Sequence, residues 1–288
     1  MRTVVACCVW MLVPLVAGAA ASDQETKSPA KSPVDWQVGP GVAALKSAAE
    51  VKLPKGYRFA NATDTQRMLK SAGEPVSGAE MGMILPEEGA WSVFFEFSDD
   101  GYVKDDDKDK LDADKLLKSI IKGNEQANQL REKQGRPPLN IVGWEKPPFY
   151  DPATHNLEWA IRAESQGRPI LNYNTRLLGR RGVMEVVLVC NPDKLAETLP
   201  AFKELLAGYT YKTGENYAEY RPGDKLAKYG LTALVAGGAV AIAAKTGLLA
   251  TIILLFKKGW KLVVLGVVAV VSFFKRVLFG RSEPRSNE

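Results

Sequence analysis

Short apolar runs separated by polar turns fill the chain between residues 39 and 222, and longer apolar runs occupy both ends. Runs rich in β-branched and aromatic residues, bounded by Gly, Pro, Asn or Asp, are typical of strands. On this pattern we predict strands at residues 42–45, 51–53, 81–85, 91–97, 139–144, 157–163, 170–178, 183–190 and 209–212. Because turns of hairpin length join consecutive strands, we expect an antiparallel sheet.

Three segments have the spacing of helices. The first follows residues 57–59 and runs from Thr63, whose side chain can cap it, to about Ser71. The second begins behind the candidate cap Asp112 and reaches about Gly135, and the third covers residues 193–207. Apolar side chains line one face of the last two helices: Leu111, Leu116, Leu117, Ile120, Ile121, Leu195, Leu199, Phe202, Leu205 and Leu206. Helices covering an antiparallel sheet make the fold class α+β.

The start of the chain has the pattern of an export signal. Arg2 precedes the uncharged, mostly apolar residues 4–16, which as a helix would measure roughly 20 Å and fall short of a bilayer core of about 30 Å. Ala19 and Ala21 fit a cleavage site before Ser22. We therefore predict a signal peptide, with an uncleaved N-terminal anchor as the alternative.

The end of the chain has the pattern of a membrane anchor. Residues 231–256 are long enough to span a bilayer with tilt, although Lys245 would lie near mid-depth at a cost of roughly 2.5–3.5 kcal/mol. Residues 260–279 form a second apolar stretch. A transmembrane helical hairpin is the preferred interpretation; a single span with an interfacial helix stays open, as does the side of the C-terminus. The expected organisation is signal peptide 1–21, flexible lead 22–38, exported domain 39–222, membrane anchor 223–280 and polar tail 281–288.

Small residues recur at every fourth position of the first expected span, at Ala233, Gly237 and Ala241. Such a row lets helices approach closely and would allow a homo-oligomer. The alternative is that Ala and Gly are simply common in apolar helices.

Charge and cysteine content narrow the classes of function. The net charge is +5, but much of the excess lies near the C-terminal end, which favours a juxtamembrane bias over a nucleic-acid surface. After signal removal Cys190 is the one remaining thiol, so the domain must be held by core packing instead of disulfides. Cys190 ends an apolar run, which predicts a buried strand residue in preference to a nucleophile.

Several motifs resemble one family. They are GYVKDD at 101–106, GW and PPFYD within 143–151, NYNTR and LGRRG within 172–182, and GDK, YGL and GG within 223–238. Together they resemble a bacterial family of uncharacterised membrane-anchored proteins defined by a domain of unknown function, DUF2167, over about residues 36–276. The resemblance implies a signal sequence, an exported domain and a C-terminal anchor, and it implies no activity. We predict that the anchor lies in the bacterial inner membrane. The order of elements also resembles, more loosely, an exported PsbP-like sandwich.

Neither the acidic run nor the histidine completes a known catalytic or metal motif. An EF-hand loop starting at Asp105 would have Lys110 at its sixth position and Leu116 at its twelfth, where Gly and Glu are required. We interpret the run as a solvated loop and helix start. His155 is the only histidine and lies in a turn-rich stretch without a matching nucleophile motif. We therefore predict no metal, no cofactor and no catalytic residue.

One cluster is a candidate binding site. Arg176, Arg180 and Arg181 lie at a strand end and the following turn, and guanidinium groups suit carboxylate or phosphate ligands. The alternative is a hairpin tip whose arginines pair with carboxylates of the chain itself.

The predicted function is a non-catalytic binding or interaction module, extracytoplasmic (periplasmic) and held to the lipid bilayer. Its partner would be another envelope protein or an anionic ligand. The alternative is a hydrolase-like envelope enzyme that uses carboxylates around His155. A deep pocket joining His155 to two or more carboxylates would favour the enzyme, and a surface groove would favour binding.

Overall fold

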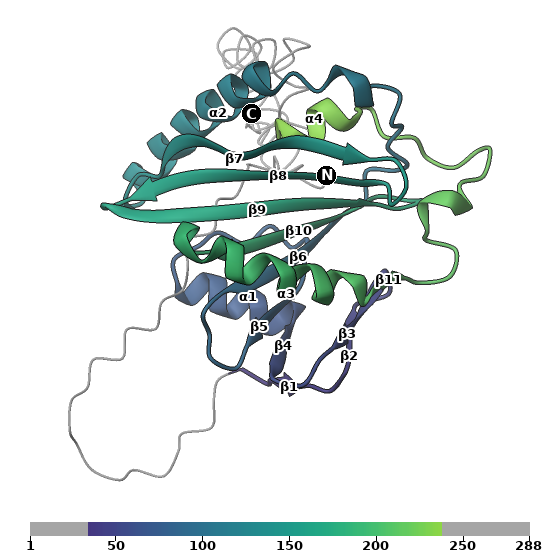
Figure 1. The fold of residues 1–288 in the computed structure, drawn as a ribbon, viewed down its shortest axis with the longest axis horizontal. Helices are drawn as coiled ribbons and strands as arrows, with labels where there is room; N and C mark the ends of the chain where they lie inside the picture. Colours follow the sequence, from purple (N-terminus) through teal and green to yellow (C-terminus); the bar gives the residue numbers. More distant parts are fainter. Residues whose placement is uncertain (1–33, 238–288) are drawn as a thin grey trace, which may run out of the picture. The chain divides into compact units, whose positions relative to one another are not determined.

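An antiparallel sheet of eight strands lies at the centre of the fold (Figure 1). The computed structural model describes residues 34–237. From edge to edge, the strands are β1 (Gln37–Val38), β4 (Tyr57–Asn61), β5 (Glu80–Pro86), β6 (Ser92–Ser98), β10 (Val183–Cys190), β9 (Arg168–Leu178), β8 (Asn156–Ser165) and β7 (Asn140–Asp151). Each neighbouring pair is antiparallel, which confirms the predicted sheet.

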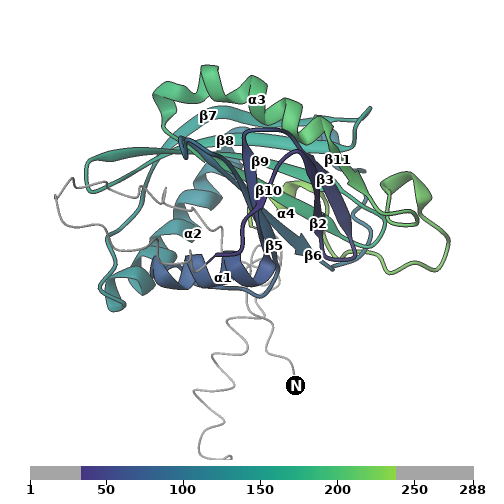
Figure 2. The same cartoon turned by 90° about the horizontal axis from the view of Figure 1, so that it is seen from below.

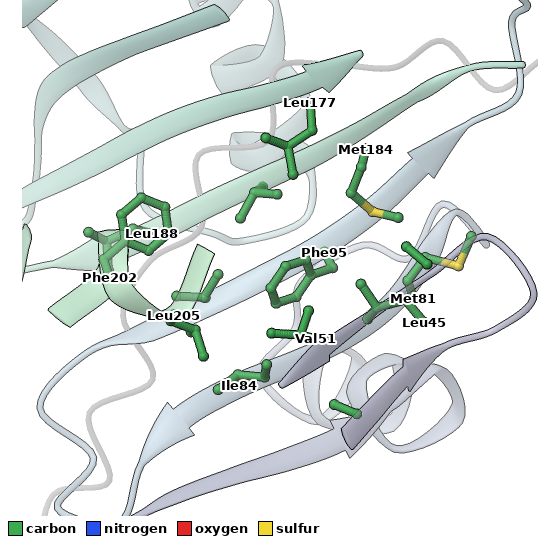
Figure 3. Packing of buried hydrophobic residues seen from close by; sticks show 14 of the residues in the cluster. Leu45, Val51, Met81, Ile84, Phe95, Leu177, Met184, Leu188, Phe202 and Leu205 are labelled. Atoms are coloured by element: carbon green, nitrogen blue, oxygen red, sulfur yellow. The ribbon is translucent and has the colours of Figure 1, made fainter. Parts of the chain in front are cut away.

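A small sheet and one helix cover one face of the large sheet. The small sheet has the order β11 (Tyr209–Tyr211), β3 (Ala49–Leu53) and β2 (Gly41–Leu45), and α3 (Leu195–Ala207) lies beside it. Side chains that alternate along the central strands point into this layer, among them Phe95 and Leu188, which belong to the same buried cluster as Phe202 of α3 (Figure 3). The result is a sheet-on-sheet core with the helix completing it.

Three helices cover the opposite face. They are α1 (Ala62–Ser71), α2 (Ala113–Lys133) and α4 (Leu231–Val235). Figure 2 shows α3 on one side of the large sheet and α1 and α2 on the other. Burial of Leu116 and Ile120 of α2 follows the predicted helical spacing.

The helices α1 and α2 begin with side-chain caps, and one of the two predicted caps needs correction. The Asp112 carboxylate accepts a hydrogen bond from Lys115 N at 3.0 Å, as predicted for the long helix. The first helix is capped by Asn61, whose Oδ1 accepts from Asp64 N at 3.0 Å, so it begins before the predicted cap Thr63. Asn is at least as good a cap as Thr, and its use places Thr63 inside the first turn.

The edge strand β7 is longer than predicted, because Pro147 and Pro148 lie within it instead of forming a turn. An edge strand tolerates proline, since one side of it makes no ladder hydrogen bonds. The register shifts between Lys146 and Phe149, which marks an irregularity at the same place.

The first residues of the expected membrane span belong to the folded domain. Leu231, Leu234 and Val235 are buried in the apolar cluster under α2. Within residues 34–237 no helix has both the length and the apolar character needed to cross a bilayer. The rest of the expected spans, the signal peptide, most of the flexible lead and Ala241 lie outside the described residues.

Candidate functional site

Arg180 and Arg181 form the turn between β9 and β10 and bind the segment that leads to α4. We call this segment, residues 213–230, the C-terminal strap. The Arg180 guanidinium donates from Nε and Nη2 to the Asp224 carboxylate at 2.7 and 2.8 Å. Arg181 donates from Nε to Glu215 Oε2 at 2.7 Å. Two predicted site residues therefore hold the chain's own carboxylates, as in the alternative that the sequence left open.

Arg176 lies near the end of β9 and does not share the partners of Arg180 and Arg181. It is buried and pairs with Glu185 of β10 at 2.8 Å, and its guanidinium lies 4.8 Å from the centre of the Trp159 ring. The structure places the three arginines on one hairpin but gives each a different carboxylate partner. A role for them in binding an external anion stays a prediction.

Arg176 ends a row of ionisable residues that crosses four strands. In register, Glu80 of β5 faces Glu96 of β6, Glu96 faces Glu185 of β10, and Glu185 faces Arg176 of β9. Glu80 is buried and accepts hydrogen bonds from Ser77 N and Gly78 N at 2.7 and 2.8 Å. Sequence analysis missed this row, because it depends on strand order and register.

The neighbouring charges of the row change the protonation of Glu96. Burial, followed by the charges of Glu185 and Glu80, raises the pKa of Glu96 to about 8, and the charge of Arg176 opposes the shift. Glu96 therefore carries its proton at neutral pH, which relieves the repulsion between three neighbouring carboxylates.

His155 lies in the turn between β7 and β8, in the left-handed region with φ 54°. Its Nδ1 is 3.0 Å from the Tyr150 hydroxyl, which donates to Asp105 Oδ2 at 3.0 Å. Burial, together with the hydrogen bond and charge of Asp105, raises the pKa of Tyr150. The chain Asp105–Tyr150–His155 thus connects a carboxylate to the histidine through a phenol.

Aromatic rings continue from His155 onto the C-terminal strap. The centres of the His155 and Tyr217 rings are 4.5 Å apart, and Tyr217 stacks on Tyr102 at 4.4 Å. Tyr102 also contacts Tyr220 at 4.4 Å. The Tyr217 hydroxyl donates to Val103 O at 2.9 Å, so the rings are fixed by hydrogen bonds as well as by packing.

A cleft of about 340 Å³ opens beside His155. It is lined by the β7–β8 turn, the end of β9, the end of α3, β11 and the strap. The lining residues are Thr154, His155, Asn156, Leu177, Leu178, Leu206, Tyr209, Thr210, Tyr211, Asn216, Tyr217 and Ala218. None of these is an Asp, Glu, Lys or Arg, so the cleft offers aromatic faces, apolar surface and uncharged hydrogen-bonding groups.

Carboxylates of the acidic run have specific structural partners. Asp107 accepts from Leu231 N and Thr232 N at 2.9 and 3.0 Å and so caps α4. Asp100 accepts from the Ser98 hydroxyl at 2.6 Å and from the Tyr229 hydroxyl. Among residues 34–237 no group of His, Cys, Asp and Glu side chains is arranged to hold a metal ion.

Sequence analysis also missed a second network, which surrounds the buried carboxylate of Glu158. Glu158 accepts hydrogen bonds from the Tyr173 hydroxyl at 2.6 Å, from Lys146 Nζ at 3.1 Å and from Lys203 Nζ. These residues come from β7, β8, β9 and α3, so the network fastens α3 to the sheet. Burial acts to raise the pKa of Glu158, but the hydrogen bonds from Lys203 and Tyr173 leave it lowered.

Comparison with known proteins identifies a family and distant similarity to solved structures. The model of the family described as "Protein of unknown function (DUF2167)" matches residues 37–270. Among curated proteins, none matches the chain. The solution structure of cyanobacterial PsbP (CyanoP) from Synechocystis sp. PCC 6803 has a TM-score of 0.38 and 10% identity, and the match covers 66% of this chain and 98% of that one. This likeness is too distant to carry an argument about function.

Proposed function

Because the chain belongs to the family of proteins of unknown function DUF2167, which brings no activity with it, we propose its function from its residues and geometry. The protein is an extracytoplasmic binding module tethered to a bacterial inner membrane, and it is not an enzyme. The apolar residues 4–16 and the small residues behind them support export. Leu231, Leu234 and Val235 are buried in the domain, so the support for the tether comes from the apolar residues 236–256 and 260–279.

The observation that carries the binding role is the composition of the cleft beside His155. A binding site needs apolar and aromatic surface with a few polar groups that fix orientation. Leu177, Tyr211 and Tyr217 supply the first, and Thr154 and Asn156 supply the second. Since the lining residues carry no carboxylate or fixed cation, an uncharged group of the partner suits the cleft better than an ionic one.

The alternative enzyme has one specific observation in its favour, the Asp105–Tyr150–His155 chain. A hydrolytic base would use such a carboxylate to orient the histidine. The lining of the cleft, however, supplies neither the second carboxylate nor a serine or cysteine nucleophile, and Cys190 is buried in the core on β10. The geometry therefore supports binding over hydrolysis.

Photo-crosslinking in the cleft tests the binding role. A benzoylphenylalanine at Ala218, in the cleft wall, is compared with one at Ala72, which is also exposed but follows α1 on the other side of the sheet. The full chain is expressed in its own host and irradiated in intact cells. We expect a discrete adduct at position 218 and none at position 72. The same adducts at both positions, or none at 218, would contradict the proposal.

A further inference from the structure

The C-terminal strap presents an exposed strip of aromatic, apolar and basic side chains. Tyr220 is 36% exposed and Leu226 is 44% exposed. Arg221, Lys225 and Lys228 are exposed between and beside them. Tyrosine, leucine and basic residues together are the composition that favours the interface between a bilayer and water.

Backbone hydrogen bonds fix this strip to the domain. Tyr102 N donates to Lys225 O, and Ala227 N donates to Tyr102 O, both at 2.8 Å, so residues 102 and 226 form a parallel bridge. At Gly101, an added Cβ would lie 2.5 Å from Lys225 O, so the close approach of the two segments requires glycine there. The strip is consequently held in a fixed position on the surface of the folded domain.

The charge of the strip is positive because its acidic member is already paired. The Asp224 carboxylate is occupied by Arg180, which leaves Arg221, Lys225 and Lys228 to act outward. Lys225 Nζ donates to the backbone oxygen of Asp99 at 2.6 Å, and the exposed side chain of Asp99 lowers the net charge locally. Basic residues near an anionic bilayer strengthen binding to it.

The position of the strip in the chain indicates what covers it. Gly237, the last described residue, comes eleven positions after Leu226. Leu231, Leu234 and Val235 are buried in the domain, so the part of the apolar stretch that can enter the membrane begins after them. Only the short helix α4 and two further residues separate the strap from the rest of that apolar stretch, which keeps the strip within reach of the bilayer that would hold the tail.

From these observations we infer that residues 220–228 dock the domain on the anionic surface of the membrane that holds its tail. Tyr220 and Leu226 enter the interfacial region, and Arg221, Lys225 and Lys228 contact lipid phosphates. This inference rests on the proposed tether. It adds that the domain is held against the bilayer in one orientation, instead of moving freely at the end of a linker.

Fluorescence quenching by lipids tests the docking. The full chain is placed in nanodiscs of phosphatidylcholine with phosphatidylglycerol, some lipids carrying a headgroup nitroxide. An environment-sensitive fluorophore is attached to Leu226→Cys, or to Val142→Cys as the matched control. Val142 is 62% exposed near the start of β7, away from the β7–β8 turn that contacts the strap. The unsubstituted chain reports background labelling.

We expect severalfold stronger quenching at position 226 than at position 142. Removing two charges with Arg221→Gln and Lys228→Gln, or omitting phosphatidylglycerol, should reduce that difference. Equal quenching at both positions in chain that stays with the nanodisc overturns the docking and leaves the tether intact. If quenching at position 226 is the same after the two charges are removed and after phosphatidylglycerol is omitted, the preference for anionic lipid is overturned. Chain that leaves the nanodisc overturns the tether and the docking together.

Discussion

Arg180 and Asp224, 44 positions apart in the sequence, form a two-pronged hydrogen-bonded pair at 2.7 and 2.8 Å that joins the β9–β10 turn to the C-terminal strap. The hydrogen bonds from the Arg180 guanidinium, and then the one from Arg221 N, lower the pKa of Asp224 from 3.8 to about 2. Together with the pair of Arg181 and Glu215, this pair links the central sheet to the segment that leads to the predicted anchor.

Loss of this pair should loosen the strap. For Arg180→Ala we expect faster amide exchange across residues 221–230, because the Asp224 carboxylate loses both donors from Arg180. Hydrogen exchange followed by mass spectrometry measures it. Arg162→Ala, which breaks an exposed pair with Glu145 on the β7 edge, is the control and should leave the strap unchanged. Equal amide exchange of residues 221–230 in both variants would show that Arg180 does not hold the strap in place.

The same pair predicts a dependence on acid. Because the pKa of Asp224 is lower in the folded state, the pair stabilises the fold fully above the ordinary carboxyl pKa of 3.8 and loses this effect as the pH falls toward 2. Exchange in the strap of the wild-type chain should therefore rise below about pH 4. In Arg180→Ala the rise should be much smaller. A strap that loosens near neutral pH would contradict the assignment.

Two glycine substitutions should have opposite effects on stability. Gly101→Ala forces a left-handed residue with φ 104° to carry a Cβ against Lys225 O, which should cost about 1–3 kcal/mol. Gly123→Ala, inside α2 with open space around the new Cβ, should stabilise by roughly 0.5–1 kcal/mol. Denaturant unfolding of the full chain in detergent measures both. A neutral Gly101→Ala would mean that the strap does not approach residue 101 closely.

Replacement of Glu96 should change the pH dependence of unfolding. The folded state keeps the Glu96 proton up to about pH 8, whereas an unfolded carboxyl releases it near 4.5. The free energy of unfolding should therefore fall as the pH rises between these values, on the order of 2–4 kcal/mol. Glu96→Gln removes this fall. Glu164→Gln, at an exposed position of β8, is the control. If the free energy of unfolding depends on pH in the same way in Glu96→Gln and in the wild type, the raised pKa assigned to Glu96 is contradicted.

His155 should be dispensable if the protein is a binding module. We expect His155→Ala, or the gentler His155→Asn that suits its left-handed backbone, to keep the crosslink from position 218 and to complement a deletion strain. Some stability, about 1 kcal/mol, should be lost with the Tyr217 contact and the Tyr150 hydrogen bond. A folded His155→Asn protein that fails to complement, together with a failing Tyr150→Phe, would favour the hydrolase.

Local signals allowed the sheet and helices to be predicted. The strand β10 contains the apolar run 186–189 directly before Cys190, and Asp112 is a cap that precedes an apolar helical spacing. The edge strand β7 was cut short because Pro147 and Pro148 are turn residues in most contexts. Only the sheet order shows that β7 is an edge, where proline is tolerated.

The candidate site could be predicted only in part, because it depends on contacts between distant segments. The turn holding Arg180 and Arg181 was predicted, but Asp224 and Glu215 as their partners were not, since no local pattern joins them. The row from Glu80 to Arg176 needs the register of four strands. His155 was expected to be a turn residue, and its place beside a cleft follows from the strap folding back onto the β7–β8 turn.

The tether is the central claim, and extraction at alkaline pH tests it most directly. Membranes from cells expressing the full chain are washed with sodium carbonate and sedimented, in parallel with a chain that ends after Gly237. We expect the full chain in the pellet and the shortened chain in the soluble fraction. Release of the full chain by carbonate would show that the apolar C-terminal residues are not held in lipid.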